Sequence, residues 1–172
     1  VAERWIELIR GAERSIRIAS GFLRSRPIAE ALLEVHAARP DLDIRVYLDG
    51  KEYLSEWGYA RQQRELDACL EEAGDDRADI RDCYDTGFLF SYPLHRAGID
   101  VRFKYYSYRW HYSYAEQMHH KYMIIDGETL VTGSYNLSIN AEHNTIENVA
   151  IFTGERYRAL VDAYVDNFDA IW

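Results

Sequence analysis

The chain has 172 residues, of which 48% are hydrophobic, which is the size and composition of one ordinary globular domain. Its formal net charge is −9, and only residues 93–126 are net basic, with five basic and three acidic groups. A protein that binds long nucleic acid through its phosphates should carry a wide basic surface, and this composition argues against that mode of binding. We expect no transmembrane segment, because no apolar run approaches the roughly 18 residues that a spanning helix needs. The chain starts at Val1 without Met, so we make no prediction of its compartment.

The first 50 residues have the pattern of a strand–helix–strand unit after an initial helix over residues 2–10. Residues 15–20 predict a strand, and Pro27 predicts the first turn of a helix that must end before Pro40. Alternating apolar residues over 44–48 predict the second strand, which ends at Asp49. Two strands separated by one helix indicate a parallel pair with a right-handed crossover.

Residues 51–94 form an acidic stretch that we expect to be a helical and loop insertion in a single domain of residues 1–172. Helical spacing favours a helix across 53–73, and the following DDRADIRDCYDTG is typical of an acidic surface loop. Cys69 and Cys83 lack the spacing of a zinc site, and two cysteines do not make a disulfide framework. We expect them to be buried free thiols.

Alternation over residues 99–105 predicts a third strand, and an aromatic segment follows it. The rings of Tyr108, Trp110 and Tyr112 are candidates to bind substrate. Side chains with an apolar body and a polar tip suit a lipid interface, but such rings also stack on bases of single-stranded nucleic acid. The apolar stripe over 157–171 predicts a closing helix.

The chemistry is concentrated in the stretch MHHKYMIIDGETLVTGSYN, which contains two spaced patterns: His119-x-Lys121-x4-Asp126 and Gly133-Ser134-x-Asn136. His119 and Lys121 lie two residues apart on a predicted strand, so they should project from one face. Asp126-Gly127 is a hairpin signal, and residues 128–133 would form the return strand. A two-residue loop would put Ser134 opposite His119. If the two-residue loop instead lies one residue further along the chain, Asn136 is opposite His119. We leave both registers open.

Two carboxylates have different expected roles. Asp126 is about 23 Å along the strand from His119, at roughly 3.3 Å per residue, so we expect it to serve the site only structurally, at the turn. Glu147 begins the alternating run ENVAIF, which predicts a neighbouring strand. A carboxylate bonded to one imidazole nitrogen would orient the ring for attack, and Glu147 is our candidate for that role at His119.

The two patterns, followed by a Glu-Asn strand, resemble the signature of the phospholipase D superfamily, and residues 1–50 and 95–172 resemble its module. The resemblance implies an α/β fold with a central mixed sheet flanked by helices on both faces. It also implies a phosphodiesterase that needs neither a metal nor another cofactor, in which His119 attacks the phosphodiester to form a phosphohistidine. The phosphoryl oxygens would be bound by Lys121 and Asn136, with Ser134 assisting. The implied catalytic set is His119, Lys121, Asn136, Glu147, Ser134 and Asp126.

The larger enzymes of this superfamily have two copies of the motif, whereas this chain has one. The second histidine would come from a homodimer, or from the missing half of a longer chain. We expect a phospholipid substrate, because the protein is acidic and its aromatic segment suits a lipid surface. The alternatives are a nuclease that acts on single- or double-stranded nucleic acid and a non-catalytic half of a two-motif enzyme.

Overall fold

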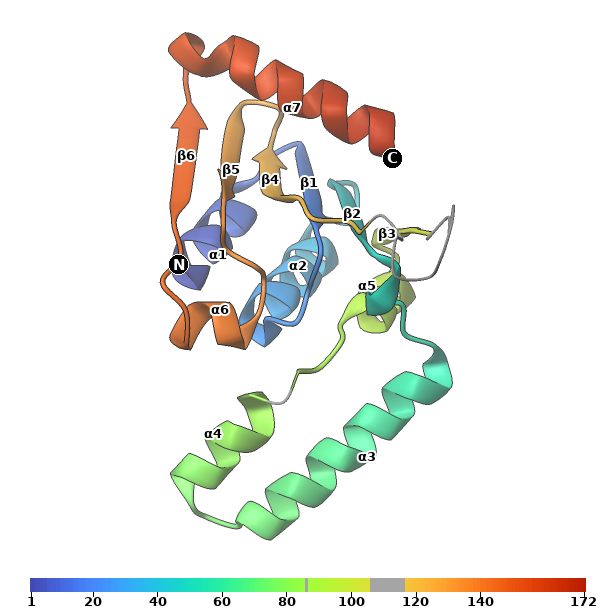
Figure 1. Cartoon of the computed structure of the whole chain (residues 1–172). Helices are drawn as coiled ribbons and strands as arrows, with labels where there is room; N and C mark the ends of the chain where they lie inside the picture. Colours follow the sequence, from blue (N-terminus) through green and yellow to red (C-terminus); the bar gives the residue numbers. More distant parts are fainter. Residues whose placement is uncertain (86, 106–116) are drawn as a thin grey trace, which may run out of the picture.

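The structure, a computed structural model, describes residues 1–85, 87–105 and 117–172. These residues form a six-stranded mixed sheet with the order β3-β2-β1-β4-β5-β6 and helices on both faces, which confirms the predicted α/β class (Figure 1). The strands are β1 (Ser15–Ser20), β2 (Asp43–Asp49), β3 (Asp100–Lys104), β4 (Lys121–Ile125), β5 (Thr129–Gly133) and β6 (Val149–Thr153).

The N-terminal unit matches its prediction closely. Helix α1 (Ala2–Gly11) precedes β1, and α2 (Arg26–Ala38) connects β1 to β2, which pair in parallel. Pro27 lies in the first turn of α2, where its missing N–H group has no helical acceptor to lose. Strand β3 extends the parallel part of the sheet beside β2, and β1 pairs on its other side with the antiparallel β4.

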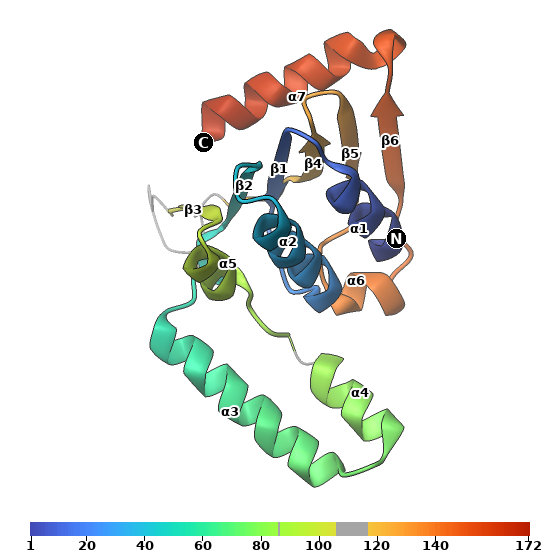
Figure 2. The ribbon, with the colours of Figure 1, turned by 180° about the vertical axis from the view of Figure 1, so that it is seen from behind.

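Each face of the sheet buries its own apolar cluster. One face is covered by α1 and α2 (Figure 2), and the apolar cluster there includes Trp5 and Ile9 of α1, Ile16 of β1 and Leu32 of α2. The other packs against the closing helix α7 (Arg158–Ile171), where Tyr122 and Phe168 are buried. The smaller elements are η1 (Gly50–Glu52), α5 (Ser91–Ala97), α6 (Ile139–His143) and η3 (Glu155–Tyr157). No helix in the described ranges is long and apolar enough to cross a membrane.

The segment predicted as an insertion contains a helical hairpin that projects away from the sheet, formed by α3 (Glu56–Ala73) and α4 (Arg77–Asp85) (Figure 1). The prediction of a loop after residue 74 was therefore wrong. Asp76 accepts hydrogen bonds from the backbone N–H groups of Ala78 and Asp79, at 2.8 and 3.1 Å. This side-chain cap starts a helix that the acidic composition obscured.

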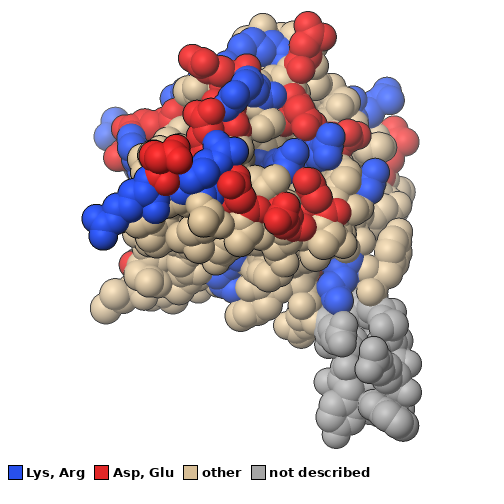
Figure 3. All heavy atoms as spheres, turned by 90° about the horizontal axis from the view of Figure 1, so that it is seen from above, with Lys and Arg blue, Asp and Glu red and all other residues tan. Residues whose placement is uncertain are grey.

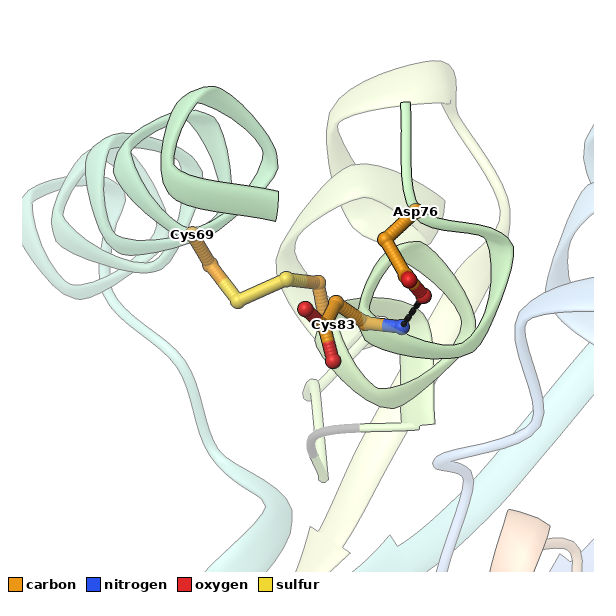
Figure 4. Close-up of a disulfide and its surroundings, with 4 residues drawn as sticks. Cys69, Asp76 and Cys83 are labelled. Atoms are coloured by element: carbon orange, nitrogen blue, oxygen red, sulfur yellow. Dashed lines mark hydrogen bonds between the residues drawn. A yellow bond between two sulfur atoms is a disulfide. The ribbon is translucent and has the colours of Figure 1, made fainter. Parts of the chain in front are cut away.

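The prediction of free thiols was also wrong, because Cys69 and Cys83 form a disulfide between α3 and α4 (Figure 4). The turn between the two helices brings their Cα atoms to 5.8 Å, a separation that a disulfide can bridge. Closing a loop of this length stabilises a fold by about 3 kcal/mol in the chain-entropy model. Only the pairing of the two helices reveals this cross-link, since the spacing of 14 residues alone does not.

Strands β4 and β5 form the predicted hairpin, but in neither of the two predicted registers. Ile125 pairs with Thr129, so the loop has three residues, and the N–H group of Glu128 donates to the Ile125 carbonyl at 2.9 Å. Asp126 and Gly127 both have positive φ, at 58° and 68°. Continuing this register by three residues from the Tyr122–Thr132 pair would place His119 level with Tyr135 rather than Ser134 or Asn136.

The turn residue Asp126 joins the hairpin to the start of β1. Its carboxylate accepts hydrogen bonds from the backbone N–H groups of Glu13, Arg14 and Ser15 at 2.6 to 3.1 Å. Burial raises the pKa of the Asp126 carboxyl, but the three N–H donors and the Arg14 charge outweigh that effect, so the pKa is lowered overall. As the strand length led us to expect, this carboxylate lies at the far end of β4 from His119.

We predict that Asp126→Ala lowers the free energy of unfolding by about 1–3 kcal/mol at pH 7, because it leaves several N–H groups without an acceptor. The folded-state pKa lies below the unfolded value of about 3.9, so this contribution is present above that pH. It disappears as the pH falls through the lowered pKa. Urea titrations of both proteins between pH 7 and 2.5 measure the difference. The exposed Asp41→Ala serves as the control, and a difference that does not shrink in acid would contradict the assignment.

Candidate active site

The predicted site residues gather at one edge of the sheet. The parallel strands β1, β2 and β3 end there, β4 and β6 begin there, and β5 ends there (Figure 1). His119 lies two residues before β4, Ser134 directly follows β5, and Glu147 lies two residues before β6. The site is therefore built from strand ends and loops rather than from the hairpin ladder that the sequence indicated.

The backbone around His119 is held on both sides. The Asp49 carboxylate is 5% exposed and accepts a hydrogen bond from the N–H group of Met118 at 3.0 Å. The N–H group of Gly21 donates to the His120 carbonyl at 3.2 Å. A Cβ atom at residue 21 would lie 2.8 Å from the Met118 carbonyl oxygen, so this approach requires glycine. His119 is exposed between these two fixed points.

Lys121 brings its charge to the same place. Its Nζ lies 3.4 Å from Nε2 of His119 and donates to the His119 carbonyl at 3.1 Å. Partial burial lowers the pKa of Lys121, and the charge of Glu147 opposes that shift. An anion bound in front of the imidazole would therefore meet a cation already fixed beside the ring.

Ser134 and Glu147 form a second pair within the cluster. The Ser134 hydroxyl donates to the Glu147 carboxylate and accepts from the Asn148 N–H group at 3.0 Å. Thr145 donates to the other Glu147 oxygen at 2.7 Å. The hydrogen bonds from Ser134 and Thr145, with a smaller contribution from the Lys121 charge, lower the pKa of Glu147. The carboxylate is therefore ionised at neutral pH and lies within the field of Lys121.

The expected bond from Glu147 to the His119 ring is not among the hydrogen bonds of the described residues. The carboxylate bonds to Ser134 and Thr145 instead. The reason lies in the topology, because β5 separates β4 from β6 and Glu147 precedes the strand that it was expected to begin. Within one chain, Glu147 affects the cluster through Ser134 and through its charge near Lys121.

Asn136 lies at the rim of a pocket of about 350 Å³. Tyr135 is 1% exposed, so the backbone turns its two neighbours, Ser134 and Asn136, away from the core. The pocket is lined by Phe22, Arg24, Gly87, Asn136, Ser138, Ile139 and Asn140. The structure thus places Asn136 beside Arg24, a residue that sequence reasoning did not single out.

A second pocket, of about 390 Å³, opens at His119 itself. Its lining includes Lys104 at the end of β3 and His120. Burial lowers the pKa of His120, and the nearby charges of Lys121 and His119 lower it further. Sequence spacing could not identify Lys104, because only the parallel pairing of β2 with β3 brings it beside the motif. Tyr108, Trp110 and Tyr112, the predicted substrate contacts, lie outside the described residues.

Known proteins resemble this chain in sequence and in fold. Residues 5–172 match the family model described as "Cardiolipin synthase, PLD-like domain". The chain is 27% identical over 162 residues to the mitochondrial cardiolipin hydrolase of Xenopus laevis, covering 94% of this chain and 56% of that protein. It is 38% identical over 79 residues to the protein of the same name from Canis lupus familiaris, covering 46% of this chain and 27% of that protein. The chain thus spans little more than half of the first relative and about a quarter of the second.

Among solved structures, Nuc from Salmonella typhimurium, a phospholipase D family member, superposes with a TM-score of 0.61 at 20% identity. The match covers 98% of this chain and 84% of that one. NucT from Helicobacter pylori gives 0.60 at 19% identity, over 98% and 85% of the two chains. These likenesses concern the fold, and the family model extends over nearly all the sequence. The chain therefore belongs to the phospholipase D superfamily, within its PLD-like domain family.

Proposed function

We propose that the chain is a metal-independent phosphodiesterase that cleaves or transfers phospholipid phosphodiesters through a phosphohistidine at His119. One observation carries this proposal: an exposed imidazole, with its backbone fixed on both sides, has the Lys121 ammonium 3.4 Å from Nε2. A nucleophile beside a fixed cation matches what attack on an anionic phosphodiester requires.

In the proposed reaction, a ring nitrogen of His119 donates its electron pair to phosphorus, and a P–N bond forms. The bond between phosphorus and the leaving oxygen breaks, and a second histidine gives that oxygen a proton. The same second histidine then removes a proton from water or an alcohol, whose oxygen attacks phosphorus and breaks the P–N bond. Both steps conserve atoms and charge without any metal or redox partner.

The surrounding residues have distinct proposed roles. Lys121 stabilises the negative charge on the phosphoryl oxygens, and Asn136 donates to them from the neighbouring loop. The Ser134 hydroxyl donates a hydrogen bond to Glu147, so Ser134 assists mainly by holding that carboxylate in place. Glu147 in turn favours the charged form of Lys121. Asp126 supports the site from a distance by fastening the β4–β5 turn.

The second histidine is proposed to be His119 of a second copy of this chain, or its equivalent in a longer protein. The neighbourhood of the site supports a partner surface. Ile146 is fully exposed beside Glu147, and Ile151 is 37% exposed on β6, the last strand of the sheet. Apolar side chains at an open sheet edge are typical of an interface between subunits.

A phospholipid is the substrate that we favour. The relatives named above are cardiolipin hydrolases, and the chain carries a net charge of −9. On the α7 side of the molecule, seen in Figure 3, basic and acidic side chains are interspersed without a continuous basic band. We propose that Tyr108, Trp110 and Tyr112 contact the lipid surface. A nuclease is the second candidate, favoured by the likeness of the fold to Nuc. A non-catalytic half of a larger enzyme is the third.

We predict that His119→Asn abolishes turnover, reducing it at least 1,000-fold, because the nucleophile is lost. The assay uses cardiolipin-containing vesicles in EDTA, with a single-stranded oligonucleotide in a parallel reaction. His143→Asn, an exposed histidine on α6, is the matched control and should keep full activity. Cleavage of the oligonucleotide alone would reassign the substrate, whereas substantial turnover by His119→Asn would sink the mechanism.

We also predict that Asp49→Ala lowers kcat by about 10- to 100-fold with little change in KM, because displacing a positioned catalytic group by about 1 Å has that effect. Asp49→Asn retains an oxygen that can accept from Met118 and should lose less. Asp43→Asn, in the first residue of the same strand, controls for general destabilisation. If Asp49→Ala is folded and retains the kcat of the parent protein, the Met118 contact does not position His119.

A further inference from the structure

We propose that the pocket around Arg24 is a second phosphate subsite, which takes the second phosphodiester of a lipid that carries two. The inference builds on the proposed function, because it assumes that the first phosphodiester lies at His119. Its ligand class is a diphosphatidylglycerol-type lipid, in which one glycerol joins two phosphates.

Arg24 is the cation of this subsite, and its position is fixed from behind. The Glu52 carboxylate is 1% exposed and accepts from Nε and one terminal nitrogen of Arg24 at 3.0 and 2.7 Å. Glu52 also accepts from the Leu23 N–H group at 3.3 Å. The guanidinium group of Arg24 also lies over the ring of Phe22, with its central carbon 4.7 Å from the ring centroid. These contacts orient the guanidinium before any ligand binds.

The open side of Arg24 faces a pocket that suits an anion. About a third of the side chain (34%) is exposed, and it lines the pocket of about 350 Å³. The other polar lining side chains are neutral, namely those of Asn136, Ser138 and Asn140. Asn140 uses its side-chain oxygen to accept from Asn144, which leaves its amide nitrogen as the group that can donate to a ligand. No lining residue in the described part of the chain carries a carboxylate, and Glu52 itself is buried behind the guanidinium.

The same short segment connects this pocket to the proposed nucleophile. Gly21 donates to the carbonyl of His120, next to His119. Three residues further along, Arg24 donates its backbone N–H to the Leu137 carbonyl at 2.7 Å, directly after Asn136. Asn136 belongs both to the catalytic motif and to the pocket lining. A substrate whose first phosphate lies at the motif can therefore extend past Asn136 to Arg24.

Charge distinguishes a two-phosphate lipid from a polynucleotide. Among the described residues, the pocket at Asn136 is lined by one Lys or Arg side chain, Arg24, and the pocket at His119 by one, Lys104. A polynucleotide presents a row of phosphates and is bound by an extended basic surface. Besides the catalytic Lys121, the described pocket linings thus hold two separate cations rather than a basic row, and Arg24 is the one beside Asn136, where the second phosphate of a diphosphatidyl lipid would bind.

The test compares two headgroup ligands, glycerol 1,3-bisphosphate and glycerol 3-phosphate, by calorimetric titration of the 172-residue chain that carries His119→Asn. We expect the bisphosphate to bind at least 10-fold more tightly. Arg24→Gln/Glu52→Gln removes the cation together with its buried carboxylate, so no unpaired charge remains in the core. In this background the two affinities should fall within about two-fold of each other. Asn140→Ala should reduce the preference less strongly.

Arg10→Gln/Glu34→Gln is the matched control, since Arg10 also bonds Glu34 through Nε and a terminal nitrogen, but on the exposed surface. It should keep the full preference for the bisphosphate. Equal affinities in the His119→Asn protein, or a preference that survives Arg24→Gln/Glu52→Gln, would overturn the subsite. An Arg24-dependent preference for an oligonucleotide over the bisphosphate would also overturn it. Failure of the proposed function would be seen in a different experiment, the vesicle assay, as the absence of turnover that depends on His119.

Discussion

The hydrogen bond from Met118 to the buried Asp49 carboxylate is the contact on which the site depends most. It joins the end of β2 to the segment that enters β4, and the close approach at Gly21 joins that segment to the end of β1. Between them, His119 is exposed while its backbone is fixed. A buried carboxylate is costly unless it is hydrogen-bonded, and here the backbone N–H groups of Met118 and Lys51 both satisfy it.

The antiparallel half of the sheet brings the start of β4, the end of β5 and the start of β6 to the edge where β1 ends, and this topology assembles the rest of the cluster. Lys121 is the first residue of β4, Ser134 directly follows β5, and Glu147 lies in the loop before β6. The chain from Ser134 to Glu147 forms a hydrogen-bonded loop whose carboxylate acts on Lys121 electrostatically. In our account, one chain thus supplies a nucleophile, a cation and a carboxylate at an open edge, and the proton donor comes from a second motif.

Local signals predicted the elements better than the contacts between them. The strand–helix–strand unit was readable because Pro27, Pro40 and the alternation in β2 each indicate their structure within a few residues. The hairpin register could not be predicted in the same way, because one additional loop residue shifts the pairing of the two strands. That loop depends on the positive φ angles of Asp126 and Gly127. The Cys69–Cys83 disulfide and the proximity of Arg24 to Asn136 arise from long-range packing, which leaves no periodic signal in the sequence.

In the proposed dimer, two copies of His119, one from each chain, complete a single site. The most direct measurement purifies a heterodimer of the parent chain and its His119→Asn variant through two different affinity tags, and assays it on phospholipid vesicles in EDTA. We expect less than about 1% of the parent activity, because the single site of this heterodimer has one histidine and therefore lacks either the nucleophile or the proton donor. Half of the parent activity, or full activity from a monomeric parent chain, would contradict this expectation.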